Sequence, residues 1–269
     1  MSSPAVDWQP HDYQKQAVRF LIERACAGLF LEPGLGKTSI TLAALKVLRV
    51  KGLVKRTLII APLRPAYLVW PVEAQKWTDF VATRVEVLHG ADKERALRRD
   101  ADVYVINPEG LQWLFRQDHR WFYDKLDVLV IDESTRFKHT QTQRFKSLRP
   151  MLNKFKRRII LTGTPVPNGL LDLFGQIYVL DQGAALGRFM SHFRAQYFSP
   201  TGYGGYTWMI NSGAEAQIYE RIEPLVLRMS EADYLELPPL IKDTVVVELP
   251  AKARKAYDVL ERDFVIKLR

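Results

Sequence analysis

Two kinds of apolar pattern alternate along the chain. Short, nearly continuous runs rich in branched side chains are typical of strands that are covered on both faces of a sheet. Longer segments repeat apolar residues every three or four positions, which predicts amphipathic helices. The strands are expected at 28–32, 57–62, 84–90, 102–107, 127–132 and 157–163. The helices are expected at 11–26, 37–50, 66–79, 108–117, 140–153 and 169–180.

This alternation predicts an α/β fold. Strands that alternate with helices form a mostly parallel central sheet with helices on both faces. Right-handed crossovers bring the carboxyl ends of the strands to one edge of the sheet, where ligands of such folds bind. We therefore expect functional residues directly after strands.

The pattern changes after about residue 181. Helices are predicted near 187–197 and 213–227, and a glycine- and tyrosine-rich loop or hairpin lies between them at 199–208. One more strand is predicted at 243–250, and an amphipathic helix follows at 251–269.

We expect the chain to have three parts. Residues 1–180 form the core, residues 181–240 form a helical and hairpin insertion, and residues 241–269 supply a final strand and the start of a further helix. This last helix shows no capping or stop signal before Arg269. The missing signal predicts that the chain is cut from a longer protein.

Composition narrows the class of protein. The 269 residues are 47% hydrophobic and 26% charged, which is typical of a globular domain with ample core material. No run approaches the roughly 18 apolar residues of a membrane span, and the first residues lack the order of a secretory signal. Cys26 is the only cysteine, so an internal disulfide and a multi-cysteine zinc site are excluded. A reducing, cytoplasmic setting is expected.

The chain is basic. Lysine and arginine exceed aspartate and glutamate by 39 − 30, a net charge of +9. Such an excess favours a polyanionic partner, because neutralising phosphates releases counterions. Solubility alone is the alternative explanation.

The stretch LEPGLGKT, residues 31–38, ends like a phosphate-binding loop. The usual pattern has its first glycine where this chain has Leu31. A predicted strand nevertheless precedes the loop and a predicted helix follows it, as phosphate binding requires. Gly34 and Gly36 would let the backbone approach the phosphates of ATP, Lys37 would reach the β- and γ-phosphates, and Thr38 would hold Mg²⁺. A glycine turn before a surface helix is the alternative.

A second candidate element is the strand DVLVIDES, which ends in Asp132 and Glu133. Asp132 suits Mg²⁺ coordination, and Glu133 can orient and activate an attacking water. This pair favours hydrolysis over phosphate transfer by a simple kinase, whose acceptor brings its own hydroxyl. The alternative is an ordinary helix start, with an aspartate cap and a glutamate in the first turn.

A third candidate element, LTGTPVPN at 161–168, follows the next predicted strand. The hydroxyls of Thr162 and Thr164 flank Gly163 on a tight turn. They are candidates for sensing the γ-phosphate or for bonding the carboxylates of Asp132 and Glu133.

Taken together, these stretches resemble the superfamily 2 helicase-like ATPases, and among them the Swi/Snf family in a compact bacterial or phage form. That family commonly lacks the first glycine of the loop too. The resemblance implies a RecA-like P-loop lobe with ATP and Mg²⁺ as cofactors, and a Q motif in which Tyr13 and Gln14 read adenine. The stretches that carry it are PGLGKT as motif I, LIIAPLRPAYLVWPVEAQKW as motif Ia, VIDES as motif II, LTGTPVPN as motif III, and 222–257, which resembles the segment crossing to a second lobe.

The sequence departs from the family pattern at two places. Motif II reads Asp-Glu-Ser-Thr where Asp-Glu-Ala/Gly-His is usual, so Ser134 or Thr135 is the candidate to replace the coupling histidine. The crossing segment has Arg228 and Met229 where two basic residues are common.

The resemblance implies an ATP-driven translocase on double-stranded DNA. Its partners would be the DNA backbone, a second RecA-like lobe that this chain lacks, and unidentified proteins. Because the second lobe supplies charge-stabilising arginines, this chain by itself is expected to hydrolyse ATP weakly. A strand-separating DNA or RNA helicase and an ATP-binding regulatory module acting through proteins are the alternatives. The expected compartment is a bacterial or phage-infected host cytoplasm, with the nucleus left open.

Matched positions also suggest DNA contacts. Arg64 and Lys138 are the leading candidates for phosphate contact, followed by Arg136. We expect 95–99 to be an exposed helix face and 153–158 a solvated turn. Two pairs of aromatic residues are expected to have structural roles. For Tyr203 and Tyr206 a hairpin or protein-contact role is favoured over base stacking. Trp70 and Trp77 are expected to pack the helix that carries them onto the sheet.

Overall fold

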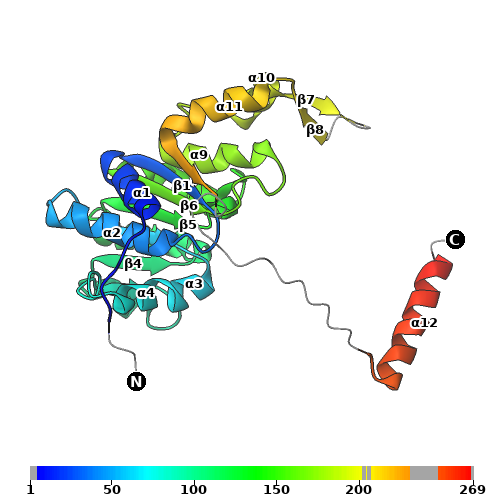
Figure 1. Cartoon of the computed structure of the whole chain (residues 1–269), viewed down its shortest axis with the longest axis horizontal. Coiled ribbons are helices and arrows are strands. Elements are labelled where there is room, and N and C mark those ends of the chain that lie inside the picture. Colours follow the sequence, from blue (N-terminus) through cyan, green and yellow to red (C-terminus); the bar gives the residue numbers. More distant parts are fainter. Residues whose placement is uncertain (1–4, 202–203, 205–206, 231–247, 268–269) are drawn as a thin grey trace. The chain divides into compact units, whose positions relative to one another are not determined.

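The computed structural model describes residues 5–201, 204, 207–230 and 248–267. The chain divides into two compact units, Met1–Leu235 and Glu236–Arg269, which are described separately. A parallel sheet forms the centre of the first unit (Figure 1). Its strands are β1 (Cys26–Leu31), β2 (Thr57–Ile60), β3 (Val85–Val87), β4 (Val103–Ile106), β5 (Val128–Asp132), β6 (Arg157–Thr162) and β9 (Val226–Met229).

The strand order is β3-β4-β2-β5-β6-β1-β9. All neighbouring strands of this sheet pair in parallel, so all seven carboxyl ends lie at one edge. The six strands expected between residues 28 and 163 all form, and the α/β prediction is confirmed. The strand pattern is correct because the sheet is buried on both faces, where continuous apolar runs are required.

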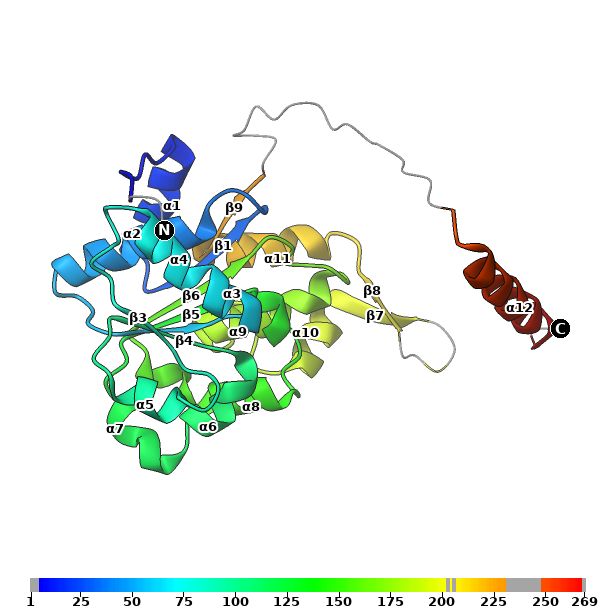
Figure 2. The ribbon, with the colours of Figure 1, turned by 90° about the horizontal axis from the view of Figure 1, so that it is seen from below.

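Helices cover both faces of the sheet, as Figure 2 shows. Each face has its own hydrophobic core, one built around Leu29, Leu31 and Trp70 and the other around Phe30, Tyr104 and Phe137. On the first face lie α1 (Asp12–Glu23), α2 (Lys37–Val50), α3 (Leu63–Leu68) and α4 (Trp70–Lys76). On the second face lie α5 (Lys93–Arg98), α6 (Leu111–Leu114), α7 (Arg120–Tyr123), α8 (Gln143–Leu148) and α9 (Leu173–Asp181).

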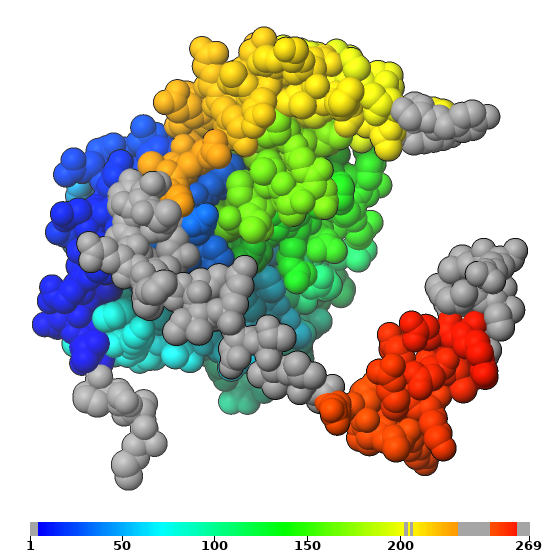
Figure 3. All heavy atoms as spheres, turned by 45° about the vertical axis from the view of Figure 1, so that its right-hand side comes forward, coloured from blue at the N-terminus to red at the C-terminus, as the bar shows by residue number. Residues whose placement is uncertain are grey.

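A further layer covers α9 (Figure 3). It consists of α10 (Met190–Tyr197), the antiparallel hairpin of β7 (Phe198–Thr201) and β8 (Thr207–Ile210), and α11 (Ala214–Ile222). Buried side chains of α10 and α11 join the second core, so this layer is packed onto the sheet domain. The predicted loop or hairpin is thus a hairpin, and Tyr203 and Tyr206 lie outside the described residues.

Several predicted helices are shorter or divided. The segment 66–79 overlaps two helices, α3 and α4, which are separated at Val69, and Pro71 lies in the first turn of α4, a position that suits proline. The segment 140–153 forms α8 and then a 3-10 helix, Arg149–Lys154, which contains Pro150. The segment 108–117 likewise divides into a 3-10 turn and α6, and 169–180 begins with the 3-10 turn Leu170–Asp172. The short helix α5 corresponds to the helix face expected at 95–99, whereas the short helix α7 was not predicted.

The helix predicted at 213–227 is wrong at its carboxyl end. Pro224 cannot continue the helix, and Val226–Met229 instead forms the edge strand β9 beside β1. Of the strand predicted at 243–250, residues 243–247 lie outside the described residues and 248–250 belong to no helix or strand. In the second unit, α12 (Ala251–Lys267) confirms the predicted helix over its range. No described helix is long and apolar enough to cross a bilayer.

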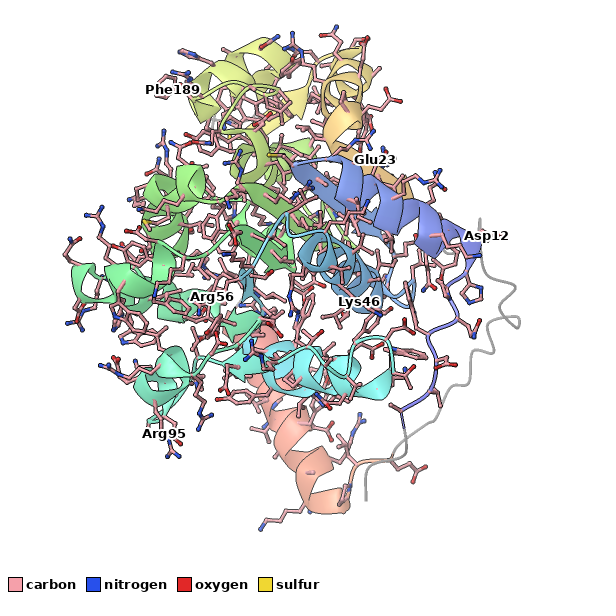
Figure 4. The ribbon with its side chains drawn as sticks, turned by 90° about the vertical axis from the view of Figure 1, so that its left-hand side faces the viewer. Asp12, Glu23, Lys46, Arg56, Arg95 and Phe189 are labelled. Atoms are coloured by element: carbon pink, nitrogen blue, oxygen red, sulfur yellow. The ribbon has the colours of Figure 1, made fainter. Side chains whose placement is uncertain are left out.

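The amino ends of the strands carry a network of paired charges. Asp102 binds Arg49 at 2.7 Å and Arg84 at 3.1 Å, and Asp127 binds Lys156 at 2.6 Å. A cleft of about 770 Å³ opens beside this network, and Lys46 and Arg56, labelled in Figure 4, are among its lining residues.

Two arginines correct the expectation of a solvated turn at 153–158. The Arg157 guanidinium donates to the carbonyl oxygens of Leu21, Ile22 and Arg24, which end α1. The Arg158 guanidinium donates to Leu152 and Leu180 carbonyls and to the sulfur of the half-buried Cys26. These side chains are therefore structural. The segment 95–99 behaves as expected, with its arginines exposed.

Candidate active site

Three adjacent strand ends bring the predicted elements together. β6 lies between β1 and β5, with Thr162 paired to Phe30 and Leu161 paired to Asp132. Because the strands are parallel, the loops that follow them leave the sheet at the same edge. The phosphate loop, the carboxylate pair and the T-G-T turn therefore meet there.

The loop between β1 and α2 has the backbone geometry of an anion site. Gly34 and Gly36 have φ values of 90° and 76°, in the left-handed region that glycine tolerates best. Gly36 directly precedes α2, and no side chain caps that helix. The amino end of α2, with its positive dipole end, therefore remains open to a phosphate. A side chain at Gly36 would collide with Gln14, since a Cβ there would lie 2.6 Å from Nε2 of Gln14.

Leu31, where the common loop pattern has glycine, is the last residue of β1. Its side chain is fully buried in the core on the α2 face of the sheet. A leucine fits because this position still belongs to the strand and the loop turns only afterwards. The missing first glycine is therefore compatible with the loop.

Lys37, the first residue of α2, points back over the loop. Its Nζ donates to the carbonyl oxygens of Leu31 at 2.8 Å and Glu32 at 3.2 Å. Burial lowers the pKa of Lys37, while the charges of Glu133 and Asp132 oppose this shift. The ammonium thus lies within electrostatic reach of both carboxylates, and an arriving phosphate would offer it a stronger acceptor than a carbonyl.

Asp132 ends β5 beneath α4. The indole Nε1 of the fully buried Trp70 donates to its carboxylate at 3.0 Å. Burial raises the pKa of Asp132, and the Trp70 hydrogen bond and the Lys37 charge partly offset that shift. Trp70 packs as expected, but its hydrogen bond to Asp132 left no signal in the sequence.

Glu133 holds an unusual backbone conformation. Its φ of 54° and ψ of 61° are left-handed, which is costly for a residue with a Cβ and is typical of functional sites. Burial, followed by the neighbouring Asp132 charge, raises the pKa of its carboxyl. Within the part of the chain that the structure describes, no ion pair involves Glu133. A carboxylate in this state is suited to accept a proton from water.

The T-G-T turn after β6 lies against the phosphate loop. A Cβ at Gly163 would stand 3.0 Å from the Pro33 ring, so the two loops approach closely. Thr162 is fully buried, and its hydroxyl accepts the amide of Thr164 at 3.1 Å. Thr162 therefore shapes the turn, while Thr164 is exposed.

The Q-motif candidates lie behind the loop. Gln14 accepts the His11 amide at 3.0 Å, and its Nε2 lies 3.4 Å from the Leu35 carbonyl oxygen. Tyr13 is buried in the core and stacks on His11 at 5.5 Å. Gln14 thus joins α1 to the phosphate loop, and Tyr13 packs beneath it.

The three candidate DNA residues differ in exposure. Arg64 on α3 and Arg136 after β5 are exposed at the carboxyl edge. Lys138 is only 15% exposed and forms an ion pair with Asp172 at 3.0 Å. A DNA phosphate would have to compete with Asp172 for Lys138.

The site fits a nucleotide with Mg²⁺. The open amino end of α2, the Lys37 ammonium and the neighbouring carboxylates match the groups that such ligands require. Among the described residues no group of three or more His, Cys, Asp or Glu side chains could hold a metal ion. Mg²⁺ in phosphate sites needs only one or two protein ligands, which Thr38 and Asp132 can supply.

The fold and this site define a P-loop nucleoside triphosphatase of the α/β class. Residues 13–269 match the SNF2-related domain family, and the chain belongs to that family. This chain has the RecA-like fold that a solved SWI2/SNF2 ATPase core also shows.

Named relatives are similar over most of this chain. "Putative protein p41" of Acyrthosiphon pisum secondary endosymbiont phage 1 is 34% identical over 272 residues, covering 96% of this chain and 58% of that protein. "Helicase domino" of Drosophila melanogaster is 26% identical over 92% of this chain and 8% of its own length. The chain thus spans little more than half of the phage relative.

Solved structures share the fold. The Sulfolobus solfataricus SWI2/SNF2 ATPase core in complex with dsDNA superposes with a TM-score of 0.69 at 25% identity, covering 86% of this chain and 46% of that one. The Sulfolobus solfataricus SWI2/SNF2 ATPase core domain gives a TM-score of 0.66, with 88% and 47% covered.

Proposed function

We propose that this chain is the first motor lobe of an ATP-driven translocase on double-stranded DNA. The observation that carries the proposal is the meeting of Lys37, Asp132 and Glu133 at one sheet edge, with the pKa values of both carboxyls raised. The basic charge of the chain and the DNA in one similar structure support the choice of partner.

The proposed roles follow from the chemistry of each group. Lys37 and the loop amides around Gly34 and Gly36 bind the phosphates of ATP, and Gln14 and Tyr13 support the adenine side. Thr38 and Asp132 hold Mg²⁺, which neutralises phosphate charge when bound. Glu133 accepts the proton of the attacking water.

Thr162, Gly163 and Thr164 would couple the nucleotide to the rest of the lobe. Gly163 lies against the phosphate loop, so a shift of that loop on binding would reach the turn directly. Arg64, Arg136 and Lys138 would contact the DNA backbone, which suits movement without sequence preference.

The remaining predictions extend this proposal. Residues 1–180 form the motor core, 181–240 the insertion, and 241–269 lead to a second lobe that supplies charge-stabilising arginines. The chain by itself would then hydrolyse ATP slowly. The proposed compartment is the cytoplasm of a bacterium or of a phage-infected host.

The experiment that tests this function compares nucleic acids as activators. ATP hydrolysis by the full-length polypeptide is measured with duplex DNA, single-stranded DNA, RNA and no nucleic acid. Stimulation by duplex DNA alone is the expected result. Stimulation mainly by single strands or RNA would favour a strand-separating helicase, and equal rates without nucleic acid would contradict both motor functions and favour a regulatory module.

A further inference from the structure

The helix α9 and the 3-10 turn before it share one buried face. This face contacts the segment 134–138, which follows Asp132 and Glu133. This face consists of Asp172, Gly175 and Gln176, which are spaced at helical intervals. Gln176 is completely buried in a helix that is otherwise almost entirely apolar, LFGQIYVLD. Buried amides are costly unless they are hydrogen-bonded, so this glutamine calls for a partner.

Gln176 bridges the two loops of the site. Its Oε1 accepts a hydrogen bond of 2.6 Å from the hydroxyl of Ser134, the residue directly after Glu133. Its Nε2 donates to the carbonyl oxygens of Pro165 at 2.7 Å and Asp172 at 2.9 Å. Both amide hydrogens are therefore used, and the two carbonyls fix which end of the amide carries nitrogen.

A second bridge joins the same two segments. Lys138 pairs with Asp172 at 3.0 Å, and the same carboxylate oxygen accepts the amide of Asn168 at 3.0 Å. Both charged side chains are largely buried, at 15% and 7% exposure. Charge-assisted hydrogen bonds in such a place are stronger than exposed ones.

Gly175 lets α9 approach closely enough to form these bridges. A Cβ at this position would overlap the carbonyl oxygens of Phe137 and Lys138. The helix therefore touches the backbone of the 3-10 turn Ser134–Phe137 without an intervening side chain. The left-handed backbone of Glu133 directly precedes this turn, and such conformations persist only where the surroundings enforce them.

We propose that Gln176 is a positioning residue for hydrolysis, acting through Ser134 on Glu133 and through Pro165 on the T-G-T-P turn. The inference rests on the proposed function, because it assumes that Glu133 is the general base. It assigns the role of the absent coupling histidine to a serine–glutamine pair. The loss of this bridge would leave the nucleotide-binding groups in place but loosen the link between Glu133 and the 163–168 turn, because only the Lys138–Asp172 pair would still join the two segments.

The test compares wild type with Gln176→Leu and Ser134→Ala in the full-length polypeptide. Leucine roughly keeps the volume but removes all three hydrogen bonds. In both variants we expect the single-turnover rate of ATP hydrolysis to fall about 10- to 100-fold, because small misplacements of a catalytic group have effects of this size. The Kd for Mg·ATP should stay within about twofold. A wild-type rate in Gln176→Leu would overturn the inference.

A second readout does not depend on turnover. Amide hydrogen exchange of 163–170 is measured with and without a non-hydrolysable Mg·ATP analogue. Wild type should change its protection there on binding, whereas Gln176→Leu should bind the analogue and show no such change. The same change in both proteins would contradict the role of Gln176.

Tyr104→Phe is the matched control for lost stability. The Tyr104 hydroxyl donates to the backbone carbonyl oxygen of Arg99 at 2.6 Å and accepts from the Ala101 amide at 3.0 Å. These bonds lie at the amino edge of the sheet, opposite the candidate site. This variant should keep its hydrolysis rate within about twofold, and a fall matching that of Gln176→Leu would overturn the inference. Failure of the proposed function would differ, because hydrolysis by wild type itself would then not be stimulated by duplex DNA.

Discussion

The two edges of the central sheet use charge in opposite ways. At the amino edge, Asp102 is paired with Arg49 and Arg84, and Asp127 is paired with Lys156. At the carboxyl edge, no ion pair within the described part of the chain involves Asp132 or Glu133. The same residue type is thus neutralised at one edge and left available at the other.

The pKa values follow this difference. At Asp102 burial would raise the pKa, but hydrogen bonds from Arg84 and the charges of Arg49 and Arg84 outweigh it, and the pKa lies below its usual value. At Asp132 burial outweighs the hydrogen bond from Trp70 and the charge of Lys37, so the pKa of its carboxyl is raised. The paired carboxylates of the amino edge therefore stabilise the fold, whereas Asp132 and Glu133 at the carboxyl edge are available for chemistry.

Glu133→Gln should give the largest effect. The substitution removes the proton acceptor, and we expect hydrolysis to fall by about 10²- to 10⁴-fold while Mg·ATP binding persists. Stability should not fall, because the substitution removes a half-buried carboxyl that forms no ion pair among the described residues. Steady-state hydrolysis, nucleotide titration and urea unfolding measure the three quantities. Full turnover in this variant would show that Glu133 is not the general base.

Asp102→Asn should have the opposite effect to Glu133→Gln: a lower stability with almost unchanged hydrolysis. Asp102 is 8% exposed on its side chain and binds two arginines, so its loss should reduce the free energy of unfolding by about 2 kcal/mol. Hydrolysis at a temperature where the variant is folded should stay within about twofold of wild type. Urea unfolding at pH 7 measures the first quantity. A variant that kept its stability but lost hydrolysis would reverse our assignment of the two edges.

Acid should remove the contribution of the amino edge. Because the folded-state pKa of Asp102 is lowered, its stabilisation is fully present above the ordinary carboxyl pKa of about 4 and is lost as the pH falls through the lowered value. The difference in unfolding free energy between wild type and Asp102→Asn should therefore shrink from about 2 kcal/mol at pH 7 as the pH falls below the ordinary carboxyl pKa of about 4. A difference that stayed constant over this range would mean that ionisation of Asp102 does not contribute.

Arg64→Ala should have the smallest effect. Arg64 is exposed on α3, so the fold should be unchanged. If it contacts one phosphate, the slope of log affinity for duplex DNA against log salt should decrease by about one. Fluorescence anisotropy at several salt concentrations measures this slope. The exposed Arg95 on α5 offers a matched control, since Arg95→Ala should leave the slope unchanged.

The sequence was most informative where local pattern and buried position agree. The strands β1, β5 and β6 and the residues Lys37 and Asp132 could be predicted, because a phosphate loop and a carboxylate pair need a defined strand before them. β9 could not, since it owes its conformation to pairing with β1, almost 200 residues earlier. Its one local signal was Pro224.

Tertiary contacts explain the other differences. The hydrogen bond from Trp70 to Asp132 joins residues that are 62 positions apart, and the local sequence around either residue does not indicate it. Gln176 did leave a signal, a single amide in an apolar helix, but its partners Ser134 and Pro165 come from other loops. The arginines at 157 and 158 were misread as solvated because their carbonyl acceptors end distant helices.

The measurement that tests the central claim most directly is calorimetric titration of Mg·ATP into wild type and Lys37→Ala. Lys37 lies above the phosphate loop and within reach of both carboxylate charges. The account predicts one site per chain in wild type and at least about 100-fold weaker binding in the variant, because a charge-assisted contact to phosphate is lost. Equal affinity in the two proteins would show that the nucleotide does not bind at this edge of the sheet.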